Sequence, residues 1–473
     1  MLRGWKFEIL LDGKSDKAIY LQIADAIIND IQSGRLMPRE ALPGSRKLAQ
    51  LLKVNRNTVV EALDVLIMEG WLTPKERQGT FVADTLPDFM GGKKSKRGTL
   101  NAKNAINKHY HLQFDDGSPD SKIAPITELA RAYRQIFNQK ARWQMMGYGN
   151  ELGDLEFRKS IVQMLNHQRG MQVDHHNICI TRGSQMAMYL TAQYLFTEND
   201  YVIVENPGYK PAWSAFENAG ATLLPVGVDK DGLLIEEVIA YLKSGKKVRA
   251  IYVTPHHQYP TTVTLSLKRR LELIQLSNAY GFTIIEDDYD NEFHFGYRPV
   301  LPLSSFGELK NYVYIGSMSK VVAPALRIGY LVTHDEALME RVSSLRKIID
   351  VQGDSIMEQA VLQLIKDGTI KRHIKKASHH YKAKRDFMAG LLTKYMQDRA
   401  TYSVPEGGLA FWIVPNKPVD WSQIPKKLNS KGIKIISPDT YCFNETIYGI
   451  RLGYGSLSEK ELEEGIIALQ EIL

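Results

Sequence analysis

A lysine that could act as a nucleophile follows a predicted strand in the second half of the chain. The apolar run Tyr312 to Ile315 is followed by Gly316 and by Ser317-Met318-Ser319-Lys320, with Arg327 further on. A lysine just after a strand and a Gly-Ser turn is well placed to form a Schiff base with an aldehyde cofactor. The motif is short, and taken alone it has a simpler interpretation as a solvated lysine.

A second predicted strand places a carboxylate where such a cofactor needs one. Ile284 and Ile285 lead into Glu286-Asp287-Asp288-Tyr289. The pyridine nitrogen of pyridoxal 5'-phosphate (PLP) requires a carboxylate partner to stay protonated, so that the ring can act as an electron sink. Lys320 together with Asp287 therefore indicates PLP chemistry.

Three further segments end predicted strands with groups that could contact a phosphorylated pyridine. Arg182-Gly183-Ser184-Gln185 opens a helix, and a helix N-terminus with a glycine turn favours a phosphate. Tyr209 stands in a turn where its ring could stack on the cofactor. His257 and Gln258 could hydrogen-bond the ring oxygen. Each segment alone has an ordinary structural interpretation, but open α/β sheets bind ligands at the carboxyl ends of their strands, so together they support one site.

From about residue 109 onward, short apolar segments alternate with helical patterns. Continuous apolar strands separated by helices imply a parallel sheet that is covered on both faces. From about Leu345 the pattern becomes mostly helical, followed by short strands and a closing helix, which predicts a smaller C-terminal subdomain. The expected strands of the sheet include residues 177–181, 201–204, 248–253 and 282–285.

The first 84 residues have a different pattern, that of a winged helix-turn-helix. Apolar residues at helical spacing predict a helix over Tyr20 to Ser33. Ser45 is placed to cap a second helix, and after a short turn Asn57 opens a third. Residues 71–83 alternate like two short strands around a hairpin with Gly79 near its tip, which predicts the wing.

Positive charge is concentrated in and after this first region. The formal net charge of the 473 residues is +7, yet residues 45–60 carry basic side chains and no acidic one. Residues 85–108 are also basic and lack periodicity, which predicts a flexible linker. A local basic stripe favours nucleic acid more than the total charge does. The residues expected to contact DNA through the recognition helix and the wing are Ser45, Arg46, Arg56, Asn57, Thr58, Arg77 and Gly79.

Other features of the composition limit the class of protein. Cys179 and Cys442 are far apart in sequence, which predicts neither a disulfide framework nor a metal cluster. The N-terminus has no apolar leader segment, and no uninterrupted apolar span is long enough to cross a membrane. We therefore expect a cytoplasmic protein with two buried thiols and no bound metal.

Residues 109–473 resemble the fold-type I aminotransferases, and residues 1–84 resemble the winged helix-turn-helix of the GntR family. Joined in this order through residues 85–108, they resemble the MocR subfamily of bacterial regulators. The resemblance implies a homodimer, usually domain-swapped, with PLP held as an internal aldimine on Lys320. It further assigns Asp287 to the pyridine nitrogen, Tyr289 to the ring hydroxyl oxygen and Tyr209 to ring stacking. The implied phosphate-binding set is Ser184, Gln185, Ser317 and Arg327. Gly183, His257 and Gln258 are expected from their own positions to contact the cofactor as well.

The chain departs from the pattern of the GABA-responsive members of this subfamily. Pro211 and, roughly, Thr440 stand where those members carry arginines for the carboxylate of the effector. His256 and Thr262 also replace a usual serine and glycine. Arg451, in a predicted C-terminal strand, falls where aminotransferases place the arginine that holds an α-carboxylate; a surface arginine on an edge strand is the alternative. We therefore expect an α-amino acid, or PLP itself, as effector rather than GABA.

Two functions from different classes fit these features. The first is a DNA-binding transcription regulator whose aminotransferase-like domain binds PLP and senses PLP, an amine or an amino acid through aldimine formation. The second is a working PLP-dependent aminotransferase with an appended DNA-binding domain. A scaffold that no longer binds the cofactor is disfavoured by Lys320, Asp287 and Arg327.

Overall fold

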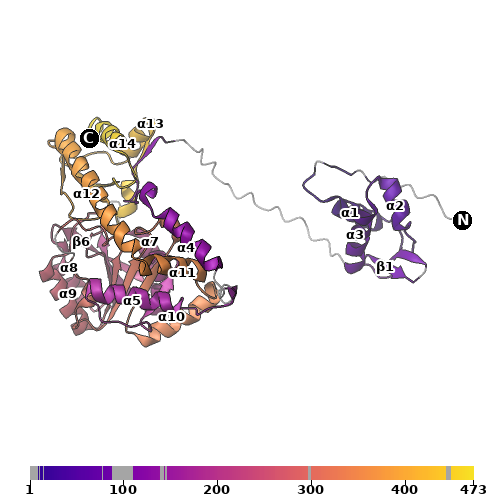
Figure 1. Cartoon of the computed structure of the whole chain (residues 1–473), viewed down its shortest axis with the longest axis horizontal. Coiled ribbons are helices and arrows are strands. Elements are labelled where there is room, and N and C mark those ends of the chain that lie inside the picture. Colours follow the sequence, from indigo (N-terminus) through magenta and orange to yellow (C-terminus); the bar gives the residue numbers. More distant parts are fainter. Residues whose placement is uncertain are drawn as a thin grey trace. The chain divides into compact units, whose positions relative to one another are not determined.

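The computed structural model divides the chain into two compact units, Met1–Ile106 and Asn107–Leu473 (Figure 1). Arg77 of the predicted wing and residues 88–108 of the predicted linker lie outside the described residues. Within the described part of the chain, no helix is both long and apolar enough to span a bilayer. The structure describes residues 9, 11–13, 15–76, 78–87, 110–138, 143, 146–296, 300–443 and 449–473.

The first unit packs three helices against a two-stranded antiparallel ribbon. Its core is formed by residues at helical spacing, including Ile23 and Ile27 of the first helix and Val59, Leu63 and Leu66 of the third. This periodic burial is what makes the amphipathic segments helical, as the sequence predicted. The elements are α1 (Ile19–Gln32), α2 (Ser45–Leu52), α3 (Arg56–Met68), β1 (Leu72–Lys75) and β2 (Gly79–Val82).

The turn between α2 and α3 is defined by local backbone chemistry. Lys53 ends α2 in the left-handed conformation, with φ 54°. The Asn55 side chain caps α3 by accepting a 2.9 Å hydrogen bond from the Asn57 backbone N–H. The prediction that Ser45 caps α2 was wrong, because Gly44 is the N-cap and no side chain bonds there. The Ser45 hydroxyl instead accepts a 3.4 Å hydrogen bond from the Arg56 guanidinium.

The second unit is built on an eight-stranded sheet with the order β4-β11-β10-β9-β8-β5-β6-β7. The strands from β10 to β6 run parallel, as predicted, but β11 lies antiparallel between β4 and β10, and β7 is antiparallel to β6. The sheet is therefore mixed. Its strands are β4 (Ile178–Thr181), β5 (Tyr201–Asn206), β6 (Thr222–Asp229), β7 (Gly232–Leu233), β8 (Val248–Val253), β9 (Thr283–Asp288), β10 (Tyr312–Ser317) and β11 (Gly329–Val332).

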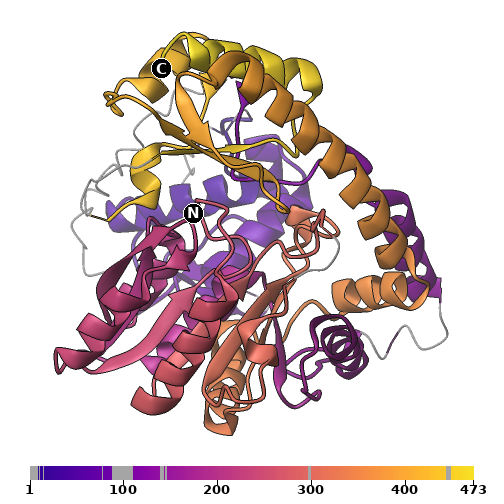
Figure 2. The ribbon, with the colours of Figure 1, turned by 90° about the vertical axis from the view of Figure 1, so that its left-hand side faces the viewer.

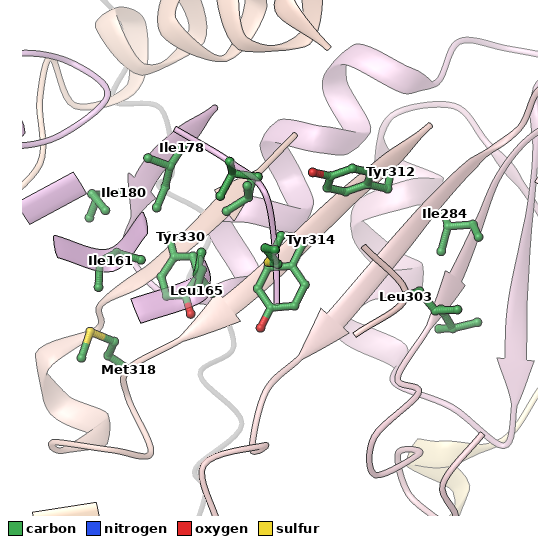
Figure 3. Packing of buried hydrophobic residues seen from close by; sticks show 14 of the residues in the cluster. Ile161, Leu165, Ile178, Ile180, Ile284, Leu303, Tyr312, Tyr314, Met318 and Tyr330 are labelled. Atoms are coloured by element: carbon green, nitrogen blue, oxygen red, sulfur yellow. The ribbon is translucent and has the colours of Figure 1, made fainter. Parts of the chain in front are cut away.

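Helices cover both faces of this sheet, because alternate residues of each strand point to opposite sides (Figure 2). Ile180, Ile284 and Tyr314 join the core on one face, which is formed with α4, α5, α8, α9 and α11. Figure 3 shows Tyr314 of β10 beside Tyr330 of β11 in this core. Cys179 joins the opposite core with α6, α7 and α10. The bounds are α4 (Ile126–Asn138), α5 (Leu155–Arg169), α6 (Ser184–Leu195), α7 (Lys210–Asn218), α8 (Ile235–Lys243), α9 (Leu267–Tyr280), α10 (Glu336–Ile349) and α11 (Ser355–Lys366).

A smaller core lies in the C-terminal part of this unit, drawn in orange and yellow in Figure 2. It draws on α12 from Ala377 onward and on an antiparallel sheet of order β12-β13-β15. Leu112 and Phe114, from far upstream in the chain, also belong to this core. The elements are β3 (Leu112–Gln113), which pairs with β14, and α12 (Thr369–Met396), β12 (Ala400–Tyr402), β13 (Ala410–Pro415), α13 (Ile424–Ser430), β14 (Ile433–Lys434), β15 (Ile450–Gly453) and α14 (Glu459–Gln470).

Candidate cofactor and DNA-binding sites

A cavity of about 220 Å³ opens at the carboxyl ends of the parallel strands. It lies where the strands β9 and β10 deliver the two motifs that the sequence singled out. Parallel strands bring their carboxyl ends to one edge, which explains why residues distant in sequence meet there. The lining residues are Asp116, Gly117, Ser118, Pro119, Ser184, Tyr209, Tyr252, Thr254, Tyr259, Asp287, Tyr289, Ser317, Ser319, Lys320, Pro324 and Arg327.

Asp287 is the penultimate residue of β9 and is buried in the cavity wall. One carboxylate oxygen, Oδ2, accepts a 2.8 Å hydrogen bond from the Tyr252 hydroxyl. The other, Oδ1, is buried and has no hydrogen-bond partner among the described residues. Burial raises the pKa of Asp287 to about 7, although the Tyr252 hydrogen bond opposes the rise. A buried acceptor of this kind requires a donor, and a protonated pyridine nitrogen is one.

Lys320 reaches the same cavity from the turn after β10. Its ammonium nitrogen lies 3.9 Å from Asp290 Oδ2 and 4.6 Å from the centre of the Tyr289 ring. Burial lowers the pKa of Lys320, while the charge of Asp290 opposes this shift. A lowered pKa increases the share of neutral amine, which is the form that attacks a carbonyl carbon.

Another part of the cavity lining has the features of a phosphate site. Ser184 is the first residue of α6. The partial positive charge at the N-terminus of a helix stabilises a bound anion. Gly183 has φ 78°, and a Cβ there would lie 2.8 Å from Arg327 Nη2, so the glycine leaves room for the guanidinium. Arg327 donates a 3.3 Å hydrogen bond to the Arg182 carbonyl and remains exposed. Ser317 also belongs to the lining.

The cavity wall also has aromatic rings. Tyr209, at the start of α7, makes an edge-to-face contact with Tyr259, with ring centres 5.0 Å apart. Tyr289 donates a 2.9 Å hydrogen bond from its hydroxyl to the His257 carbonyl. Tyr209 and Tyr289 thus both line the cavity.

Five predicted site residues do not line this cavity, and one of them is Gly183, which lies next to Arg327. His257 is bound through Nδ1 to Asp290 at 2.7 Å, and Gln258 donates to the Pro207 carbonyl at 2.9 Å. Gln185 donates to the Pro211 carbonyl at 2.8 Å. Arg451 is buried on β15 and forms an ion pair with Asp116 at 3.2 Å. Arg451 is therefore no surface arginine, and its guanidinium lies behind a residue of the lining.

The substitution of histidine for the usual serine at position 256 also has a structural reason. His256 Nδ1 lies 3.2 Å from Asp288 Oδ1, and the Asp288 Oδ2 accepts a 2.6 Å hydrogen bond from the Tyr314 hydroxyl. Although burial opposes it, the charges of His256 and Arg169 hold the pKa of Asp288 well below its usual range. His256 thus lies against a buried carboxylate.

Sequence reasoning missed several lining residues. Tyr252 holds Asp287, yet its role depends on the pairing of β8 with β9, which no local pattern reveals. The turn Asp116-Gly117-Ser118-Pro119 lies far upstream of the sheet in sequence. Its Asp-Gly-Ser-Pro composition does signal a turn, and Gly117 has φ 83°. Nothing local, however, links that turn to a cofactor site.

The first unit presents its predicted DNA-contacting residues around α2 and α3. Arg46, Arg56 and Asn57 are exposed, Ser45 and Thr58 are half-buried, and Gly79 is exposed at the start of β2. Arg56 is the first residue of α3, so its side chain projects from the N-terminal turn of the helix that follows the HTH turn. This is the end of a recognition helix that reads base edges.

Comparison with known proteins identifies the two halves. The family model described as "Bacterial regulatory proteins, gntR family" matches residues 19–82. Over its length the chain is 25% identical to the probable rhizopine catabolism regulatory protein MocR of Rhizobium meliloti, with 98% of this chain and 95% of that protein covered. It is 28% identical to the uncharacterized HTH-type transcriptional regulator YdfD of Bacillus subtilis, with 95% of each covered. The predicted resemblance to the MocR subfamily is confirmed.

The second unit has the aminotransferase fold. It is similar to the kynurenine aminotransferase of Pyrococcus horikoshii in complex with PMP, with a TM-score of 0.72 and 25% identity over 78% of this chain and 91% of that one. The fold class predicted from the sequence is thus confirmed for both halves. Aminotransferases of this fold are PLP-dependent, and the fold implies the same cofactor here.

Proposed function

We propose that this MocR-type chain is a DNA-binding transcription regulator that holds PLP on Lys320 and responds to an amine, an amino acid or PLP itself. The observation that carries the proposal is the buried Asp287 Oδ1, which has no partner within the described residues and lies in the wall of the cavity that Lys320 enters. A protonated pyridine nitrogen would satisfy this oxygen. The GntR-type domain of the same chain supplies the DNA-binding half of the proposal.

The residues of the cavity have complementary roles in this proposal. When bound, PLP supplies an electrophilic carbon that reacts with primary amines. Lys320 anchors the cofactor, and Asp287 keeps the ring nitrogen protonated. Ser184, Ser317 and Arg327 bind the phosphate, while Tyr209 stacks on the ring. Five further residues shape the site or hold the residues of the lining in place, namely Tyr289, Gly183, Gln185, His257 and Gln258.

The same proposal assigns a homodimer and a double-stranded operator. Two helix-turn-helix heads in one dimer would read two half-sites, with α3 in the major groove. We further propose that the dimer is domain-swapped, as the resemblance implies, and that the protein acts in the cytoplasm.

Borohydride reduction of the PLP-treated full chain tests the cofactor half of the proposal. Wild type should absorb in the visible range and retain PLP covalently after reduction. Lys320→Ala should retain none, whereas the exposed Lys310→Ala should behave as wild type. Covalent labelling of Lys320→Ala would show that another lysine carries the cofactor.

Selection from randomised DNA, followed by mobility-shift assays, tests the DNA half of the proposal. Failure to enrich any sequence would refute this half.

A working aminotransferase is the second candidate, and the buried Arg451 favours it. Its guanidinium donates a 3.3 Å hydrogen bond to the hydroxyl of Tyr289, a residue of the lining, so it lies near enough to assist an α-carboxylate. Multiple-turnover transamination with a keto-acid acceptor distinguishes the two candidates. Sustained turnover would support the enzyme, and spectral change without turnover would support the sensor.

A further inference from the structure

The guanidinium of Arg451 already has an anionic partner inside the protein. Its Nε lies 3.2 Å from Asp116 Oδ1, and its Nη1 donates a 2.9 Å hydrogen bond to the Pro260 carbonyl. The Arg451 side chain has no exposed surface, whereas that of Asp116 is 37% exposed. Among the described residues, Asp116 is the carboxylate within ion-pair distance of this arginine.

Asp116 stands between the cavity and Arg451. It belongs to the lining together with Lys320, whereas Arg451 does not. A ligand held near Lys320 therefore meets the Asp116 carboxylate before it meets the guanidinium. Two carboxylates repel each other, and one guanidinium edge cannot bind both in the same geometry.

We propose that Asp116 is a specificity-determining residue that competes with the carboxylate of an effector for Arg451. The inference rests on the proposed function. An amino acid must displace Asp116 before its carboxylate reaches the arginine. The apparent affinity for the amino acid is therefore lower when Asp116 is paired with Arg451 in a larger fraction of the molecules. An amine without a carboxylate does not face this competition. Asp116 therefore reduces the difference in binding affinity between amino acids and the corresponding amines.

The turn that carries Asp116 is braced independently of the ion pair. Asp115 Oδ1 accepts hydrogen bonds from the Gly117 and Ser118 backbone N–H groups at 2.9 and 2.8 Å, and the Asp115 carbonyl accepts one from Gly453 N–H at 3.0 Å. Changing the charge of Asp116 should therefore leave the backbone of the turn in place. Asp116→Asn keeps the shape of the side chain and removes its charge.

The test titrates the PLP-loaded full chain with matched pairs of ligands, followed by calorimetry and by the cofactor absorbance. The pairs are L-alanine and ethylamine, L-leucine and 3-methylbutylamine, and L-phenylalanine and 2-phenylethylamine. Asp116→Asn should bind the amino acids about tenfold more tightly, if the paired form dominates by that factor in wild type. Its affinity for the amines should change less than about twofold. The exposed Asp398→Asn is the control for loss of one negative charge and should match wild type.

Equal changes for both ligand classes, no change for either, or no amino-acid binding by either form would overturn the inference. Asp116→Ser provides a second uncharged side chain if the asparagine variant is unstable. In an Arg451→Gln background, the gain from Asp116→Asn should disappear, because no guanidinium remains to be freed. Wild type that binds no PLP refutes the proposed function instead, so the two failures are distinguishable.

Discussion

At the residue scale, Asp287 shows how burial and function are linked in this cavity. The fold places a carboxylate where ionisation is unfavourable, since burial raises its pKa from 3.8 to about 7. Tyr252 satisfies one oxygen and leaves the other for a ligand. A protonated cofactor nitrogen that donates a hydrogen bond there would offset the cost of burying this charge.

Asp287→Asn should therefore stabilise the cofactor-free protein at high pH. The raised pKa means that the folded state keeps a proton which the unfolded chain releases, so the stability from this group is full below about pH 4 and is lost as the pH rises through about 7. The advantage of the variant over wild type should grow by about 1–3 kcal/mol between pH 5 and pH 8. Urea unfolding at pH 5 and pH 8 measures this difference in the free energy of unfolding. An advantage of Asp287→Asn that shrinks as the pH rises would contradict the raised pKa of Asp287. Asp398→Asn should show no such trend.

Gly183→Ala should weaken PLP binding more than about tenfold. An alanine there adopts a strained backbone with φ 78°, and its Cβ would lie 2.8 Å from Arg327 Nη2. The displaced guanidinium would lose its position at the phosphate. Gly281→Ala is the control, because Gly281 also has a positive φ of 75° but a Cβ there meets no atom within 4 Å. Equilibrium dialysis measures the affinity of both variants for PLP. Gly281→Ala should keep the wild-type affinity for PLP, although it should lose about 1 kcal/mol of folding stability.

At the element scale, the N-terminal turn of α3 is where sequence reading by the first unit should be concentrated. Arg56→Ala should weaken binding to the selected operator by about 1–3 kcal/mol and relax the preference at one base pair. Arg35→Ala removes an equally positive side chain that follows α1 and pairs with Asp30, and it should cost less. Fluorescence anisotropy with specific and random DNA measures both. Equal loss on the two DNAs would make Arg56 a phosphate contact.

At the scale of the whole molecule, the linked heads of a dimer should recognise two half-sites together. Once one head is bound, the second binds at a high effective concentration. DNA with two half-sites should therefore bind the full chain at least about 100-fold more tightly than DNA with one. Mobility-shift assays over a series of spacings measure this preference, with ultracentrifugation of the free protein beside them. A monomer at micromolar concentration, or equal affinity for both DNAs, would count against the dimer.

The sequence by itself was sufficient for features that depend on local patterns. The spacing of Val59, Leu63 and Leu66 predicted α3, because a helix buries every third or fourth residue. Lys320 and Asp287 were identified because both end apolar strands, and parallel strands bring such ends together. Chemistry that depends on residue type and strand position can be predicted from one chain.

Only the tertiary structure decided which of these residues face the cavity. His257 and Gln258 follow a strand, and Asp287 lies near the end of one. Only Asp287 lines the cavity, because His257 is hydrogen-bonded to Asp290 and Gln258 to the Pro207 carbonyl instead. The ion pair of Asp116 with Arg451 joins the two ends of the second unit, and no periodicity relates them. β11 pairs antiparallel with both β10 and β4, and this pairing depends on the packing of the whole sheet. Contacts between residues distant in sequence depend on how the elements pack, and a local pattern carries no information about that.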